Sequence, residues 1–219
     1  MKLALITGAN RGIGLELTRQ LLGRGVQVVA ACRSSSQELD ASGAEVITGV
    51  DVTNDDSVAK LAAALGDRSL DLLVNNAGIL TRESLDDLDF DRIREQFEIN
   101  SLSPLRVTQA LLANLSNGSL VAFVTSLMGS MSDNGSGGRY GYRMSKAALN
   151  SAGVSLSHDL RPRGIGVLLL HPGMVATEMT GRCGVPVEQA ANGLLERIDA
   201  FTLEQSGTFW HADGRQLPW

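Results

Sequence analysis

Short, continuously apolar runs alternate with helical patterns along most of the 219 residues. Runs that are apolar at nearly every position suit parallel strands covered by helices on both faces of a sheet. The alternation therefore predicts a doubly wound α/β fold with about seven strands, and no Pro/Ser-rich linker divides it, so we expect one domain over residues 1–219. We interpret as strands the runs 3–6, 27–32, 45–50, 71–75, 120–125 and 165–171, and as helices the segments 12–24, 55–65, 89–115 with a break near Pro104, 142–160 and 187–200.

Composition excludes several classes of function. Nineteen basic against 24 acidic residues give a net charge of −5, which disfavours a nucleic-acid partner. No apolar run approaches the roughly 18 residues of a membrane span, and the apolar start is too short for a signal peptide. Cys32 and Cys183 form no CxxC pair, which argues against a zinc site or a disulfide framework. We expect a cytoplasmic protein without a metal.

The segment Thr7-Gly-Ala-Asn-Arg-Gly-Ile-Gly14 directly follows the first strand and opens a helix. Glycines at this place let backbone amides approach a pyrophosphate at the positive end of a helix. The spacing differs from Gly-x-Gly-x-x-Gly, so we interpret it as a variant dinucleotide loop. The alternative is a glycine-rich turn that binds nothing. The candidate cofactor residues here are Gly8, Asn10, Arg11, Gly12, Ile13 and Gly14.

The end of the second strand indicates which dinucleotide is bound. Arg33 stands where NAD-binding sites usually have an acidic residue, and residues 28–36 contain no Asp or Glu. Arg11 could reach the same 2′-phosphate, so we expect NADP(H), the alternative being two surface arginines. Asp51 and Val52 could flank the adenine, although Asp51 could simply cap the next turn.

Small residues follow the fourth strand in Asn75-Asn-Ala-Gly78, and we expect the backbone there to run along the cofactor. An ordinary Asn-Gly-type turn is the alternative. The candidate residues are Asn76, Ala77 and Gly78.

Tyr142 and Lys146 carry the predicted chemistry. They are four residues apart, so they share one face of a helix. A free phenol has a pKa near ~10, and we expect the neighbouring ammonium to lower it toward the working range of an acid–base catalyst. Tyr140 lacks a lysine four residues later, and a lone YxxxK is a weak signal. Ser126, at the end of the fifth strand, is a candidate to polarise a substrate carbonyl.

Two further places have candidate or rival residues. Asn100 is polar within an apolar helical stretch, where such a residue is more often structural. After the sixth strand, Pro and Gly fix a turn whose amides could bind a carboxamide. We interpret His171 as structural and Cys183 as no nucleophile, since neither has a suitable neighbour in sequence. The candidates in the turn are Pro172, Gly173, Val175 and Thr177.

Together these motifs resemble the short-chain dehydrogenase/reductase superfamily over nearly the whole chain, and most closely its branch of C-factor/sniffer-like carbonyl reductases. The resemblance implies a Rossmann-like fold, NADP(H) and a catalytic tetrad. Tyr142 would be the acid or base, Ser126 the carbonyl ligand and Lys146 the ribose ligand. Asn100 would hold a water next to Lys146, and Thr177 would contact the carboxamide. The motifs are TGxxxGxG at 7–14, NNAG at 75–78, Asn100, Ser126, YxxxK at 142–146 and PGxVxT at 172–177.

The expected function is NADP(H)-dependent reduction of an aldehyde, ketone or quinone, or the reverse oxidation. The alternatives are a C-factor-like signalling protein with little turnover and a non-redox isomerase or lyase. Relatives of this family pair the helices that correspond to 89–115 and 142–160, where Leu102, Leu105, Leu149 and Leu156 lie, so we expect a homodimer or homotetramer. The alternative is that these leucines all belong to the intramolecular core.

Two spacings depart from the common pattern of the family. The gap between Ser126 and Tyr142 is longer than in most members. Pro186 follows Thr177 by only nine positions, too few for a helical substrate lid, so we expect a cleft open on one side.

Overall fold

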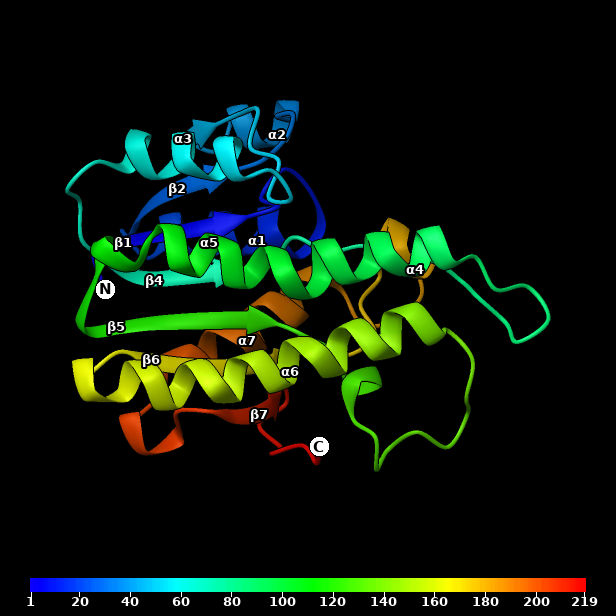
Figure 1. Cartoon of the computed structure of the whole chain (residues 1–219). Helices are drawn as coiled ribbons and strands as arrows, with labels where there is room; N and C mark the ends of the chain where they lie inside the picture. Colours follow the sequence, from blue (N-terminus) through cyan, green and yellow to red (C-terminus); the bar gives the residue numbers. More distant parts are fainter.

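Seven parallel strands form one sheet at the centre of the computed structural model, which describes residues 1–219 (Figure 1). Their order is β3-β2-β1-β4-β5-β6-β7, and every neighbouring pair is parallel. This confirms the doubly wound, Rossmann-like fold. The strands are β1 (Leu3–Thr7), β2 (Gln27–Ala31), β3 (Glu45–Ile47), β4 (Leu70–Asn75), β5 (Leu115–Val124), β6 (Gly166–His171) and β7 (Thr208–His211).

Helices cover both faces of this sheet, as the continuously apolar strands require. Alternate residues of β1 face opposite sides: Ile6 belongs to the core under α1 and α7, and Leu5 to the core under α3, α5 and α6. A strand buried on both sides cannot alternate apolar with polar residues. The helices are α1 (Gly12–Gly23), α2 (Gln37–Asp40), α3 (Asp55–Leu65), α4 (Phe90–Phe97), α5 (Ser103–Ala110), α6 (Tyr140–Leu160) and α7 (Val187–Asp199).

The predicted helix over 89–115 differs most from the structure. A five-residue π-helical turn, Glu98–Leu102, separates α4 from α5 just before Pro104, and α5 ends at Ala110. The expected break near Pro104 is therefore present, and it takes the form of a wider, π-helical turn. Four of the elements, α2, β7 and the two short halves α4 and α5, are shorter than the periodic patterns that sequence reasoning can detect.

The sheet order reverses between β1 and its two neighbours, since β2 lies on one side and β4 on the other. Ligands of open α/β sheets bind at such a switch point, outside the carboxyl ends of the strands. All the strand ends that carry predicted motifs point to this edge, at the right of Figure 1.

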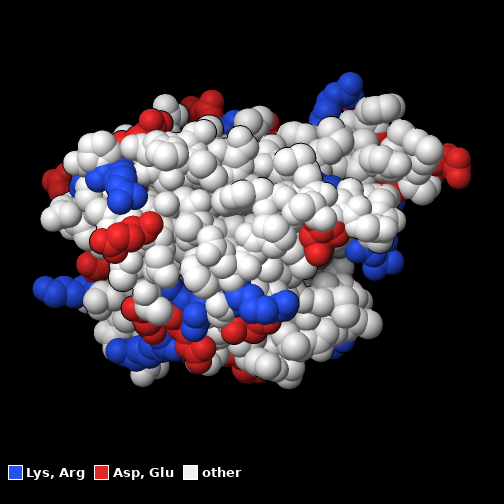
Figure 2. All heavy atoms as spheres, turned by 90° about the horizontal axis from the view of Figure 1, so that it is seen from below, with Lys and Arg blue, Asp and Glu red and all other residues white.

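On the face seen from below, acidic and basic side chains are mixed, and no continuous basic patch is visible (Figure 2). None of the helices combines the length and the apolar character that a membrane crossing needs.

Candidate active site

A cleft of about 1890 Å³ lies at the carboxyl ends of the strands. It is lined by segments that follow six strands, β1 to β6, and by the first turns of α6. The structure thus brings most of the predicted residues to one place, while Gly14, Asp51 and Asn100 do not line the cleft. The predicted residues that do are Gly8, Asn10, Arg11, Gly12, Ile13, Arg33, Val52, Asn76, Ala77, Gly78, Ser126, Tyr142, Lys146, Pro172, Gly173, Val175 and Thr177.

The glycine loop is packed so tightly that side chains would not fit. A Cβ on Gly14 would lie 2.4 Å from the Gly8 carbonyl oxygen and 2.5 Å from Nδ2 of Asn76. Asn76 fixes this arrangement by donating to the carbonyl oxygens of Thr7 and Gly8 at 3.0 and 3.1 Å. Gly14 therefore acts beneath the loop rather than on its surface.

The N-terminus of α1 faces the cleft without a side-chain cap. Arg11, at the N-cap, is extended and its side chain makes no capping hydrogen bond. The first amide groups of a helix have no intrahelical partner and carry partial positive charge. An anionic group in the cleft would accept hydrogen bonds from these amide groups.

At the next strand end, Arg33 is exposed and makes no ion pair. Arg11 differs, because its guanidinium pairs with Glu178 across the cleft. Asp51 accepts hydrogen bonds from the Thr53 amide and hydroxyl at 2.9 and 2.7 Å, and these bonds, with a smaller effect of Arg33, lower the pKa of Asp51. Its carboxylate closes a local turn, which was the alternative considered for it.

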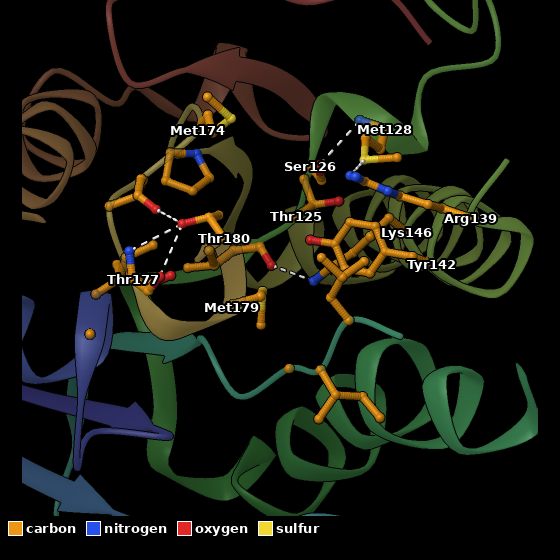
Figure 3. Close-up of a pocket in the computed structure, with 18 of the residues that line it drawn as sticks. Thr125, Ser126, Met128, Arg139, Tyr142, Lys146, Met174, Thr177, Met179 and Thr180 are labelled. Atoms are coloured by element: carbon orange, nitrogen blue, oxygen red, sulfur yellow. Dashed lines mark hydrogen bonds between the residues drawn. The ribbon is translucent and has the colours of Figure 1, made fainter. Parts of the chain in front are cut away.

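Ser126, Tyr142 and Lys146 meet in the middle of the cleft (Figure 3). Ser126 follows β5, and the other two come from neighbouring turns of α6. Lys146 is 4% exposed, its Nζ donates to the carbonyl oxygen of Val124 at 2.9 Å, and it lies 5.8 Å from the centre of the Tyr142 ring. Burial lowers the pKa of Lys146 to about 8.

The predicted direction of the Tyr142 pKa is wrong for this structure. Burial of the phenol raises its pKa above 10, and a hydrogen bond with Ser126 and the charge of Arg139 oppose this only in part. The Lys146 ammonium donates to the Val124 carbonyl and lies 5.8 Å from the centre of the Tyr142 ring. The desolvation of a phenolate outweighs its attraction to nearby cations here.

Asn100 lies behind the cleft and is fully buried within the π-helical turn. Its side chain accepts from the Ile79 amide at 2.8 Å and donates to the Ile79 carbonyl at 2.9 Å and to Ser145 Oγ at 3.1 Å. These bonds tie the segment after β4 to α6. In this arrangement Asn100 positions other elements of the site.

The segment after β6 forms one 3₁₀ turn, Glu178–Thr180, and then pairs back through Val175 and Val185. The short stretch before Pro186 thus builds no α-helical lid, as its length predicted. His171 at the end of β6 packs edge-on against His211, and burial, with the charge of His211, lowers the pKa of His171 to about 3. His171 is therefore neutral at physiological pH.

Sequence reasoning missed several residues that surround the three central side chains. Met128, Met174 and Met179 form an apolar border, and Arg139 approaches from the start of α6 (Figure 3). Arg182 also lines the cleft. Their only signal in the sequence was nearness to a motif, since single methionines and arginines have no diagnostic spacing.

Comparisons with known proteins agree with this geometry. The family model described as short chain dehydrogenase matches residues 2–185. The 1-hydroxy-2-glutathionyl-2-methyl-3-butene dehydrogenase of Rhodococcus sp. (strain AD45) is 46% identical over an alignment of 226 positions that covers 100% of both chains. The C-signal protein of Myxococcus xanthus is 47% identical over 154 positions, which cover 68% of this chain and 93% of C-signal.

Solved structures show the same likeness. The NADPH-bound carbonyl reductase from chicken fatty liver and the carbonyl reductase Sniffer of D. melanogaster superpose with TM-scores of 0.91 and 0.92. Each is 30% identical and is covered completely, as is this chain. The resemblance to the C-factor/sniffer-like branch is confirmed.

Proposed function

Because the chain belongs to the short-chain dehydrogenase family, we propose that it is an NADP(H)-dependent oxidoreductase that interconverts a carbonyl compound and its alcohol. The carrying observation is the meeting of Ser126, Tyr142 and Lys146 in a cleft whose other end is the glycine loop. The carbonyl compound would be an aldehyde, a ketone or a quinone.

The residues present fit this cofactor. Gly8 and Gly12 line the cleft with bare backbone where a pyrophosphate would lie, and the uncapped N-terminus of α1 offers it amide donors. Arg33 is a free cation at the position that recognises a 2′-phosphate. The residues that would hold the cofactor are Gly8, Asn10, Arg11, Gly12, Ile13, Arg33, Val52, Asn76, Ala77, Gly78, Tyr142, Lys146, Pro172, Gly173, Val175 and Thr177. Gly14 and Asp51, which do not line the cleft, would support them from behind, Gly14 beneath the loop and Asp51 through its turn.

The proton chemistry follows from the three central side chains. When bound, NADPH supplies the hydride that the carbonyl carbon gains. Tyr142 donates its phenolic proton to the carbonyl oxygen, and Ser126 donates a hydrogen bond to the same oxygen. The raised pKa of Tyr142 keeps the phenol protonated at neutral pH, which suits reduction. In oxidation, the phenolate would accept the alcohol proton.

Two further residues support Tyr142. The Lys146 ammonium would offset the negative charge left on the phenolate and hold the ribose of the cofactor. Asn100 fixes the backbone at Ile79 and α6 at Ser145, and would hold a water near Lys146. Asn100, Ser126, Tyr142 and Lys146 are thus the proposed tetrad.

A signalling role with little turnover is the second candidate, and the similarity to C-signal favours it. The Tyr142–Lys146 pair argues against that role, because binding alone needs neither a proton donor nor a buried ammonium. A non-redox isomerase or lyase would keep the same motifs but consume no cofactor.

A spectrophotometric screen separates these readings. NADPH oxidation is followed over aldehydes, ketones and quinones, and the alcohol product is quantified. We expect NADPH loss to equal alcohol formation for at least one class. Tight NADPH binding without oxidation on any class would contradict the oxidoreductase proposal and favour the signalling role.

A further inference from the structure

The substrate end of the cleft, formed by lining residues within 79–87, 126–143 and 174–187, contains cations without ion-pair partners. Four arginines line it, and none forms an ion pair, whereas eight other arginines of the chain do. The chain as a whole is acidic, with a net charge of −5. Glu83, Asp87 and Asp133 line the same segments, but none of them forms an ion pair with these arginines. The guanidinium groups are therefore available to an anionic ligand. The four are Arg82, Arg139, Arg143 and Arg182.

Arg143 has a structural task that explains its place. Its guanidinium donates to Ser136 Oγ at 2.8 Å and points to the carbonyl oxygens of Gly137 and Met128 at 3.4 and 3.5 Å. These bonds fold the loop before α6. The other three arginines have no such set of partners.

Two of those three are held in an unusual backbone conformation. Arg139 (φ 51°) and Arg182 (φ 63°) are the two non-glycine residues of the chain with positive φ. Left-handed backbone is strained for a residue with a Cβ, and such strain gathers at functional sites. Both strained residues are arginines, and both line the cleft.

Arg139 is also close to the reacting end. Its backbone amide donates to the Glu83 carbonyl at 2.9 Å, and its guanidinium contacts Sδ of Met128 at 3.9 Å. Its positive charge acts on the Tyr142 phenol and partly opposes the rise in the pKa of that phenol. The side chain is exposed and at the same time lines the cleft beside Met128 (Figure 3).

Methionine side chains border the cleft around the central residues (Figure 3). Met174 and Met179 are 63% and 42% exposed although they border the cleft, and Met128 lies next to Ser126. Methionine packs well against varied apolar groups. This end of the cleft thus presents both an apolar surface and guanidinium groups that form no ion pair.

We propose that the substrate is a carbonyl compound with an apolar body and an anionic oxygen group, and that Arg139 and Arg182 bind this group while the methionines contact the body. The inference rests on the proposed oxidoreductase function. Carboxylate and phosphate share the chemistry that an arginine pair recognises.

The test compares matched substrates. Omega-oxo carboxylic acids of increasing length are assayed against their methyl esters, with an omega-oxo alkyl phosphate as a third arm, all with NADPH. We expect kcat/KM to favour the charged compound of the best length at least about tenfold, the range of one charge-assisted hydrogen bond. The preference should shrink as salt rises. The better of the two charged arms identifies the anion.

Arg139→Gly and Arg182→Gly remove each guanidinium and also relieve the positive φ, so folding should be retained. Each should reduce the ratio of acid to ester kcat/KM about tenfold. Arg19→Gln, which removes an exposed, unpaired arginine of α1, should leave the ratio unchanged.

The outcomes separate the two proposals. If acids and esters are reduced equally well and the arginine variants do not change the ratio, the anionic substrate is wrong while the oxidoreductase stands. If the variants weaken NADPH affinity instead of the ratio, the arginines serve the cofactor and this inference fails. If no carbonyl compound is reduced at all, both proposals fail.

Discussion

Replacing Lys146 with methionine should uncouple stability from activity. The ammonium is buried and has no ion-pair partner, so its burial lowers the stability of the folded protein. Methionine has a similar length and no charge. We expect Lys146→Met to abolish most turnover and to leave the free energy of unfolding at pH 7 equal or higher.

The magnitude follows from the pKa of Lys146. A value of about 8 in place of 10.5 corresponds to about 3 kcal/mol of unfavourable burial at pH 7. Loss of the bond to the Val124 carbonyl offsets this by about 1–3 kcal/mol. The pH dependence is cleaner. Between pH 8 and 10.5 the unfolded chain binds more protons at this lysine, so the parent gains stability as pH rises, by about 2 kcal/mol from pH 7 to 9.5.

Urea unfolding of both proteins at several pH values measures this difference directly. The stability of the parent relative to Lys146→Met should rise by about 2 kcal/mol over that range. Lys60→Met, at an exposed position of α3, controls for loss of a lysine and should show a constant difference. A flat difference for Lys146→Met would refute the argument that the folded protein holds a desolvated ammonium.

Three further predictions concern the cofactor loop, cofactor choice and assembly. Gly14→Ala places a methyl 2.4 Å from the Gly8 carbonyl, so NADPH affinity by fluorescence titration should fall at least about tenfold, while Gly23→Ala on the same helix, with open space around it, should not change it. Arg33→Asp should shift the ratio of kcat/KM from NADPH toward NADH by about 10²-fold, and a parent with equal affinity for both cofactors would disprove the NADP assignment. Light scattering at micromolar concentration should give at least the mass of a dimer, and Leu102→Glu with Leu105→Glu should reduce it, since these leucines are 49% and 40% exposed; a monomeric parent would count against the expected assembly.

The sequence located most of the fold because its signals are local. Strand runs such as that before Gly8 and amphipathic helices such as Asp55–Leu65 are determined by neighbours in sequence, and they appear where expected. The sequence did not reveal β7 because four residues, of which only Phe209 is fully buried, carry too little pattern; they form a strand only by pairing with β6.

The dimer argument shows a second limit. Periodicity alone placed Leu149 among the residues left for an interface, but it is 1% exposed in the core under α6, and Leu156 packs against the same core. Leu102 and Leu105 do remain exposed. Which apolar residues of a helix stay outside depends on the width of the sheet beneath it, which no single helix encodes.

The sequence predicted the site where only one residue type fits a position. It could not predict properties, such as a pKa, that depend on burial and on neighbouring groups in the fold. The Gly14 position admits no Cβ, so its glycine could be found by motif. The pKa direction of Tyr142 could not, because it depends on how deeply the phenol is buried and on where the Lys146 ammonium points. The strained Arg139 likewise follows from backbone geometry that only the structure shows.

The most direct test of the account is the turnover of Tyr142→Phe on a confirmed substrate with NADPH. The ring and its packing stay, so folding and NADPH affinity should be retained, and kcat should fall by roughly 10²–10⁴-fold, the range for a lost general acid. Tyr140→Phe, two residues earlier on α6, is the matched control and should keep the parent rate. Near-parent turnover by Tyr142→Phe would contradict the assignment of Tyr142 as the proton donor.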